Sequence, residues 1–204
     1  MKRRIFYLAF TSLVIASLQF SLGGCSNSSK KTGEPATEKH DLTGDELSFF
    51  TEYANEAENN GFLLSTYTSP QDVDLDQLFY NGAGMMTEGL TQEETAAYLA
   101  ATGSSELMTD MVRLTTEQID NFLQHKMGIS LSETNGLDWT YLEDFDSYYI
   151  EHGDTNFRNY TCTSGQEENG TYHLEFQSED GSLTSSLTLK KNGDEYQFLS
   201  NVLE

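Results

Sequence analysis

The stretch TYHLEFQSEDGSLTSSLTLKKNGDEYQFLS, residues 171–200, decides the fold. Apolar and polar residues alternate along three segments of it, and Glu179-Asp180-Gly181 and Asn192-Gly193-Asp194 separate these segments. A period of two is typical of a strand with one buried face, and Asp-Gly and Asn-Gly favour tight hairpin turns. The pattern therefore predicts three sequential antiparallel strands, over residues 172–177, 183–189 and 196–199.

A fourth strand is predicted immediately before these three, over roughly residues 157–163. The chain would then pass through residues 165–170, a segment that begins and ends with glycine, into the next strand. The carboxyl-terminal part is thus expected to form an antiparallel meander of about four strands.

Three capping boxes predict helices upstream of this meander. In each, a threonine is followed three residues later by glutamate or glutamine, so that both side chains can bond backbone N–H groups at a helix start. The boxes are Thr43 with Glu46, Thr91 with Glu94, and Thr115 with Gln118. Apolar residues at helical spacing follow each box, and the helices are expected to stop at Asn59-Asn60-Gly61, at Gly103 and at Gly128.

The order of these elements indicates an α+β fold. N-terminal helices would pack on one face of the C-terminal antiparallel meander, whose other face is polar. This order is also similar to cystatin-like folds, although a shared fold does not imply a shared function.

The amino terminus has the features of a signal peptide. Lys2-Arg3-Arg4 forms a basic start, and residues 5–20 are uncharged and mostly apolar. As a helix, that run would span roughly 24 Å, less than the ~30 Å hydrocarbon core of a bilayer, so a permanent transmembrane helix is the weaker interpretation.

Leu22-Gly23-Gly24-Cys25 resembles the bacterial lipobox. The resemblance implies cleavage before Cys25 and diacylation of Cys25; the alternative is an ordinary signal peptide that happens to precede a cysteine. We therefore expect a lipoprotein signal peptide over residues 1–24, a lipidated Cys25 with a flexible tether over 25–42, and a single extracytoplasmic α+β domain over 43–204. The expected location is the cell membrane, lipid-anchored on its extracytoplasmic side.

The chain is strongly acidic, with 33 acidic and 11 basic residues and a formal charge of −22. Loss of the signal peptide would remove three basic residues and no acidic one, which moves the formal charge to −25. A surface of this charge repels nucleic acid, so no nucleic-acid partner is expected. With Cys25 lipidated, Cys162 is the remaining thiol and no intramolecular disulfide can form.

Several strings distributed over residues 43–204 resemble small lipoproteins of gut Firmicutes that have no assigned activity. They are Asn59-Asn60-Gly61-Phe62-Leu63, Leu78-Phe79-Tyr80-Asn81-Gly82-Ala83, Asp146-Ser147-Tyr148-Tyr149, His152-Gly153-Asp154-Thr155-Asn156 and Tyr196-Gln197-Phe198-Leu199-Ser200-Asn201. The resemblance supports the organisation above and implies no catalytic residue.

The string His152-Gly153-Asp154-Thr155-Asn156 allows two interpretations. Together with His173, His152 and Asp154 have the composition of a two-histidine, one-carboxylate metal triad. The same residue types also form turns in which side chains bond their own backbone, with Asp154 capping residue 156 or 157. We prefer the second interpretation, in which the string forms a structural corner of the chain. No metal or cofactor is expected, and a ligand-binding role of His152, Asp154 and Asn156 stays open.

An aromatic run precedes this string and is the other candidate surface. Its members are Trp139, Tyr141, Phe145, Tyr148 and Tyr149. Exposed aromatic faces beside Asp144 and Asp146 would suit a glycan or a peptide, whereas buried ones would close the core between the last helix and the sheet. The candidate ligand-binding residues are therefore Trp139, Tyr141, Tyr148, Tyr149, His152, Asp154 and Asn156.

Complete catalytic motifs are missing from the sequence. Asp72-x-Asp74-x-Asp76 begins like a calcium loop, but Gln77 and Ala83 occupy the positions that need glycine and glutamate. No nucleophile elbow, H-E-x-x-H or P-loop occurs. Cys162 lies in a predicted strand, and a thiol in such a position is usually structural. We therefore expect a non-catalytic envelope lipoprotein that binds an envelope protein, a peptide or a glycan; the alternative is a small envelope enzyme or metal-binding protein centred on His152 and Asp154.

Overall fold

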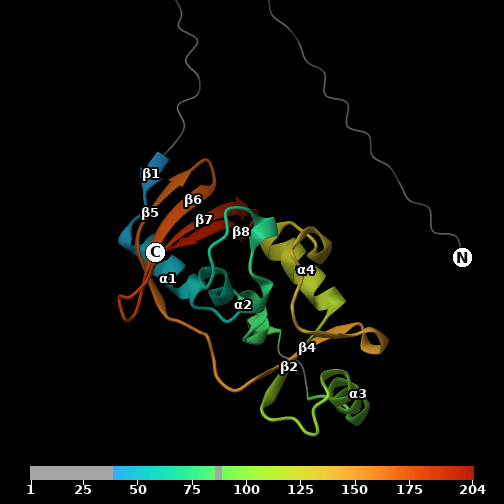
Figure 1. Cartoon of the computed structure of the whole chain (residues 1–204). Coiled ribbons are helices and arrows are strands. Elements are labelled where there is room, and N and C mark those ends of the chain that lie inside the picture. Colours follow the sequence, from blue (N-terminus) through green and yellow to red (C-terminus); the bar gives the residue numbers. More distant parts are fainter. Residues whose placement is uncertain (1–38, 86–88) are drawn as a thin grey trace, which may run out of the picture. The chain divides into compact units, whose positions relative to one another are not determined.

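The computed structural model describes residues 39–85 and 89–204 (Figure 1). The expected signal peptide, the expected lipidation site Cys25 and the expected tether up to residue 38 lie outside the described residues. No helix of the described part is long and apolar enough to cross a membrane. The described part combines helices with antiparallel sheets, so the α+β class expected from the sequence is confirmed at this level.

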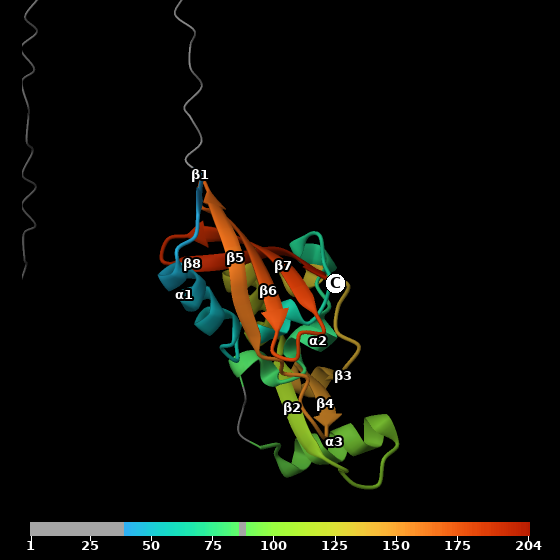
Figure 2. The ribbon, with the colours of Figure 1, turned by 90° about the vertical axis from the view of Figure 1, so that its left-hand side faces the viewer.

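The larger sheet has five strands in the order β1-β5-β6-β7-β8, and all neighbours are antiparallel (Figures 1 and 2). The last four strands are sequential and are joined by short turns, as the alternating sequence predicts. The strands are β1 (Lys39–Asp41), β5 (Tyr160–Glu168), β6 (Thr171–Ser178), β7 (Thr184–Asn192) and β8 (Glu195–Leu203).

The prediction for the first hairpin was wrong in its boundaries. Strand β5 continues through Gly165 to Glu168, and the chain turns at Asn169 and Gly170, whose φ angles are 54° and 75°. Gly165 is required for close packing, because a Cβ there would lie 2.8 Å from side-chain carbons of both Leu42 and Leu174. The sequence shows the glycine but not this neighbour, so a packing glycine resembles a turn glycine.

The folded part begins before the predicted boundary at residue 43. Lys39–Asp41 forms β1, which pairs with the end of β5, and Leu42 is buried in the main core. The predicted tether over residues 25–42 therefore overlaps a strand at its end. The polar sequence Lys-His-Asp carries no alternating pattern, since all three residues of this edge strand are exposed.

All three predicted capping boxes are present. They start α1 (Gly44–Ala54), α3 (Gln92–Thr102) and α4 (Thr116–Met127). Gly103 and Gly128 end α3 and α4 in the left-handed conformation that favours glycine. Helix α1 is shorter than predicted: it ends at Ala54, and residues Asn60–Leu63 form a 3-10 turn in place of a simple stop.

Short helical segments connect these elements. They are α2 (Leu75–Phe79) and 3-10 turns at Pro70–Asp72, Gly82–Gly84, Leu131–Glu133 and Glu143–Phe145.

A second, three-stranded sheet was not predicted. It consists of β2 (Asp110–Thr115), β4 (Ser147–His152) and β3 (Thr140–Leu142) in that spatial order, all antiparallel. Both faces of this sheet pack against hydrophobic clusters, so its strands lack the simple alternation of apolar and polar residues that marks a half-exposed strand. Figure 2 shows β2, β3, β4 and α3 gathered at the end of the molecule opposite β1.

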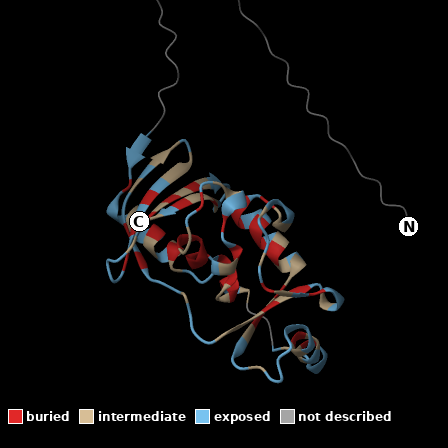
Figure 3. Ribbon diagram, viewed as in Figure 1, coloured by how far each residue is buried: buried red, intermediate tan, exposed pale blue. Residues whose placement is uncertain are grey.

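The two faces of this small sheet belong to different hydrophobic clusters. Val112 and Leu114 of β2 join the main core, which also contains the inner face of the larger sheet and buried residues of α1, α2 and α4. On the other face, Tyr149 packs with Tyr98 of α3 and with Leu142. Figure 3 shows the buried residues concentrated between the larger sheet and α4, with a smaller group under α3.

A buried carboxylate fixes α3 on the small sheet. Glu94, 2% exposed, accepts hydrogen bonds from the Thr91 N–H (2.8 Å), from Arg113 Nη1 (2.6 Å) and from the Tyr149 hydroxyl (2.9 Å). Burial raises the pKa of Glu94, but these donors outweigh it and lower the pKa to about 2. Glu94, the second residue of the capping box of α3, therefore also bonds side chains of the small sheet.

Candidate functional site

The segment between β4 and β5, residues 153–159, passes from the small sheet to the larger one and carries the candidate site. The side chains of two asparagines, the buried Asn60 and the half-buried Asn55, bond the backbone at its carboxyl-terminal end. Asn60 Nδ2 donates to the Arg158 carbonyl at 2.7 Å, and the Arg158 N–H donates to Asn60 Oδ1 at 3.2 Å. Asn55 bonds Tyr160 in the same way, at 2.8 and 2.9 Å. The two side-chain amides take the place of a neighbouring strand at this edge of β5.

Asn156 is bonded to the helix on the other side of the segment. Its Nδ2 donates to the carbonyl and to the side-chain oxygen of Gln77, at 3.3 and 3.1 Å, and its Oδ1 accepts from Asn81 Nδ2. Thr155 donates to Asn81 Oδ1 at 3.0 Å and accepts from the Phe157 N–H at 3.1 Å. Residues 155–160 are thus bonded on both sides, to the α1 end and to α2.

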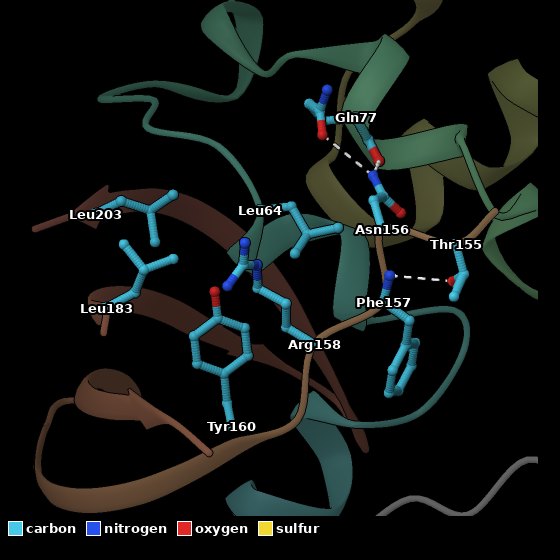
Figure 4. A pocket seen from close by; sticks show the side chains of 9 residues that line it. All are labelled: Leu64, Gln77, Thr155, Asn156, Phe157, Arg158, Tyr160, Leu183 and Leu203. Atoms are coloured by element: carbon cyan, nitrogen blue, oxygen red, sulfur yellow. Dashed lines mark hydrogen bonds between the residues drawn. The ribbon is translucent and has the colours of Figure 1, made fainter. Parts of the chain in front are cut away.

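A hollow of about 420 Å³ lies beside this segment (Figure 4). Leu183 and Leu203 lie on one side of it, and Gln77 and Asn156 lie on the other. Its lining is completed by Leu64, Thr155, Phe157, Arg158 and Tyr160. Such a mixture of apolar walls with a few polar groups is typical of ligand-binding sites.

Four residues of this lining are exposed, namely Gln77, Thr155, Phe157 and Arg158. Gln77 and Thr155 bond Asn156 and Asn81, which leaves Phe157 and Arg158 for a contact with a partner. Phe157 is 37% exposed, and the Arg158 side chain is 47% exposed, with Asp180 Oδ2 at 4.0 Å from its Nη1. Tyr160, by contrast, is 1% exposed, and its hydroxyl donates to the Leu63 carbonyl at 3.2 Å. The hollow therefore has a fixed wall and, besides Gln77 and Thr155, two exposed residues, one apolar and one cationic.

The His152 corner is structured differently from the prediction. Asp154 does not cap residue 156 or 157: its Oδ1 accepts from the Tyr80 hydroxyl at 3.0 Å, and Thr155 forms the local turn. His152 Nδ1 lies 2.8 Å from the Asp154 carbonyl, and the His152 ring meets the Tyr80 ring edge to face at 5.4 Å. A second, more open hollow of about 500 Å³ is lined by this corner and by Thr109 and Asp110.

The third residue of the metal triad considered from the sequence lies elsewhere. His173 is on β6 of the larger sheet, where it pairs with Gln166 and Thr188, whereas His152 ends β4 of the small sheet. Among residues 39–85 and 89–204, no group of three or more histidine, cysteine, aspartate or glutamate side chains could hold a metal ion. The interpretation of His152, Asp154 and His173 as one triad is therefore wrong.

The aromatic run does not form one platform. Trp139 is 7% exposed in the main core, and Tyr149 is 1% exposed in the smaller cluster on the other face of the sheet. Tyr141 and Tyr148 are opposite each other on β3 and β4 with ring centroids 4.8 Å apart, and only Tyr141 is exposed, at 44%. Trp139 is in the main core, as the core interpretation expects, whereas Tyr149 is buried in the separate cluster with Tyr98 of α3. Their burial removes both from the candidate binding residues.

Cys162 also has a structural position. It is buried in β5, and its N–H donates to Thr51 Oγ1 at 2.9 Å. Burial raises the pKa of its thiol to about 11, so little thiolate exists at neutral pH.

Of the seven candidate binding residues, Asn156 alone lines the hollow beside Phe157 and Arg158, while His152 and Asp154 line the second one. Asn55, Asn60, Phe157 and Arg158 were not recognised from the sequence. The one signal was the string Asn59-Asn60-Gly61, which looks like a helix stop until the long-range partner of Asn60 is known. Comparison of the chain with protein-family models, with curated proteins and with solved structures finds no match.

Proposed function

We propose that the protein is a non-catalytic lipoprotein domain of the bacterial cell envelope and that it binds a partner in the hollow beside Phe157 and Arg158. The observation that carries the proposal is the hollow itself, about 420 Å³ in volume, with an exposed aromatic ring and an exposed guanidinium on one backbone segment. Partners of this chemistry include an envelope protein, a peptide or a glycan that offers an apolar group beside a hydrogen-bond acceptor.

The rigidity of the segment supports this proposal. Side-chain bonds from Asn60 and Asn55 hold Arg158 and Tyr160 in place before any partner arrives. A wall that is already ordered loses less conformational entropy on binding, so more of the contact energy contributes to affinity.

Membrane attachment through Cys25 remains part of the proposal, because the lipobox that supports it lies in the sequence. Two acyl chains would anchor the domain stably, and the acidic surface excludes nucleic acid as a partner.

We also propose a cystatin-like arrangement for α1 and strands β5 to β8. It is supported by α1 lying along β5, with Thr51 and Asn55 bonded to the backbone of that strand, and by the sequential order of the four strands. This analogy concerns the fold and adds nothing to the argument on function.

A pair of matched variants of the full chain tests the binding site. Leu203→Asp places a charge in the hollow, whereas Val202→Asp places the same charge on a neighbouring residue that is 37% exposed and does not line it. Envelope protein, peptide and glycan fractions are offered to each purified chain. We expect retention of one fraction by the wild type and by Val202→Asp, with at least a tenfold loss for Leu203→Asp, as expected when a charge is left buried against a partner. Equal retention by all three chains would refute the site.

The alternative, a small envelope enzyme or metal-binding protein centred on His152 and Asp154, rests on the second hollow. It predicts that His152→Ala abolishes the protein's effect on its partner while Leu203→Asp leaves it intact. The same set of variants therefore separates the two proposals.

A further inference from the structure

A buried lysine lies next to a buried asparagine outside the proposed binding site. Lys126, in the last turn of α4, is 3% exposed, and Asn59, which precedes the Asn60–Leu63 turn, is 0% exposed. Lys126 Nζ lies 2.9 Å from Asn59 Oδ1 and 2.7 Å from Glu58 Oε1. The Tyr53 ring lies 5.8 Å from the same nitrogen and helps to close the site.

The orientation of the Asn59 amide is fixed. Its Nδ2 donates to the Tyr53 carbonyl and to Glu56 Oε2, both at 2.9 Å, which turns Oδ1 towards the lysine. The amide carbon Cγ is bonded directly to Oδ1, so the amine is close to the carbon that a nucleophile would attack. A carboxylate touches the amine, and a second one touches the amide nitrogen.

We propose that Lys126 and Asn59 join by an intramolecular amide bond that the chain forms without another enzyme. Glu58 takes a proton from the Lys126 ammonium, and the free amine attacks Cγ of Asn59. The new Nζ–Cγ bond forms as the Cγ–Nδ2 bond breaks. Nδ2 takes the proton released from Nζ and leaves as ammonia, and this ammonia then accepts the proton held by Glu58 and departs as ammonium. No oxidant, cofactor or other reactant is needed.

The site has the features that make such a reaction feasible. Two groups held at contact distance react as if at a very high effective concentration. Burial keeps water, the competing nucleophile, away from the amide carbon, and Glu58, half exposed, connects the site to solvent as a route for the departing proton and ammonia. The bond would tie α4 covalently to the segment after α1, next to the Asn60 that holds Arg158.

Peptide mapping of the purified full chain tests this proposal. Trypsin cleaves after lysine and arginine, and the described part offers Lys39, Arg113, Lys126 and Arg158 around the site. An acylated Lys126 is not cleaved, so the proposal expects peptide 40–113 joined to peptide 114–158, with a mass lower by one ammonia than the two peptides carry together. Recovery of peptide 114–126 with a free terminal lysine, as the main product from folded protein, would overturn it.

Variants separate the bond from mere proximity. Lys126→Arg keeps the charge beside Glu58 but cannot form the amide, and Glu58→Gln keeps a hydrogen-bond acceptor without the base; both should yield unlinked peptides. Lys190→Arg is the matched control, because Lys190 bonds only neutral oxygens of Asn169 and Thr171, and it should leave the link intact. A joined peptide that persists in Lys126→Arg would also contradict the assignment. The wild-type map requires no variant to fold, and the proposal is independent of the proposed binding function.

Discussion

Asn60 bonds both backbone groups of Arg158, at 2.7 and 3.2 Å, across 98 residues of sequence. Asn60 itself is 2% exposed, and its two bonds to Arg158 are partly buried. This contact joins the segment after α1 to the wall of the hollow and positions the exposed guanidinium at its rim. Through this contact the segment after α1 holds the backbone of the proposed binding site in place.

Asn60→Ala should therefore destabilise the protein and loosen the wall. It leaves the N–H and carbonyl of Arg158 without a protein partner where their bonds are partly buried, and an unsatisfied buried group commonly costs about 1–3 kcal/mol. Urea unfolding of the variant measures the cost. Asn135→Ala, at an exposed position, is the control and should change the free energy of unfolding by less than about 0.5 kcal/mol. Equal stabilities of the two variants would show that the bonds to Arg158 contribute nothing.

Glu94→Gln should change how stability depends on pH. The pKa of Glu94 is lowered from its ordinary value of 4.5 to about 2 in the folded protein. A lowered folded-state pKa means that the carboxylate stabilises the protein above pH 4.5 and that this contribution disappears as the pH falls towards 2; it amounts to about 3 kcal/mol. We expect the stability difference between wild type and Glu94→Gln to be large at neutral pH and to shrink below pH 4.5.

Unfolding measured across that range checks the prediction, and taking the difference between the two chains cancels the effect of the other carboxylates. A difference that stays constant with pH would mean that Glu94 is not ionised against Arg113 and Tyr149.

Asp154→Asn should lower the pKa of Tyr80. The hydrogen bond from the Tyr80 hydroxyl to Asp154 favours the neutral phenol and raises its pKa, and loss of the negative charge weakens that effect. A pH titration of the Tyr80 ring by NMR measures it. Asp146→Asn, which removes the equivalent charge beside Tyr141, is the control and should leave Tyr80 unchanged. An unaltered Tyr80 titration in Asp154→Asn would place the carboxylate elsewhere.

The proposed lipobox at Leu22-Gly23-Gly24-Cys25 predicts that Cys25→Ser abolishes palmitate labelling and membrane retention. Cys162→Ser is the matched control, since its buried thiol is part of the core and lies in a strand. Both effects are read from metabolic labelling and cell fractionation. A Cys25→Ser chain that still incorporates palmitate would rule out lipidation at this position.

Local signals in the sequence predicted the elements that depend on local chemistry. The capping boxes at Thr43, Thr91 and Thr115 fix helix starts because their bonds join residues three apart. Strands β6, β7 and β8 were recognised because one face of their sheet is buried and the other is exposed. The small sheet carries no such signal, since Val112 and Tyr149 are buried on its opposite faces.

The candidate site depends on contacts that no local pattern contains. Asn60 and Arg158 have partners far away in the sequence, as do Asp154 and Tyr80. Turn-forming residue types in the 152–156 string correctly indicated a corner, and Thr155 forms its local bond. The partner of Asp154 is a tyrosine 74 residues upstream, so its side chain could not be assigned from neighbouring residues.

Site-specific photo-crosslinking in cells tests the proposed binding hollow most directly. A photoreactive residue replaces Phe157, which lines the hollow, or Phe49, which is more exposed at 46% but lies on α1 away from it. The account predicts one discrete adduct from position 157, none of the same kind from position 49, and loss of the adduct when Leu203→Asp is added. The same adducts from both positions, or an adduct from position 157 that survives Leu203→Asp, would contradict it.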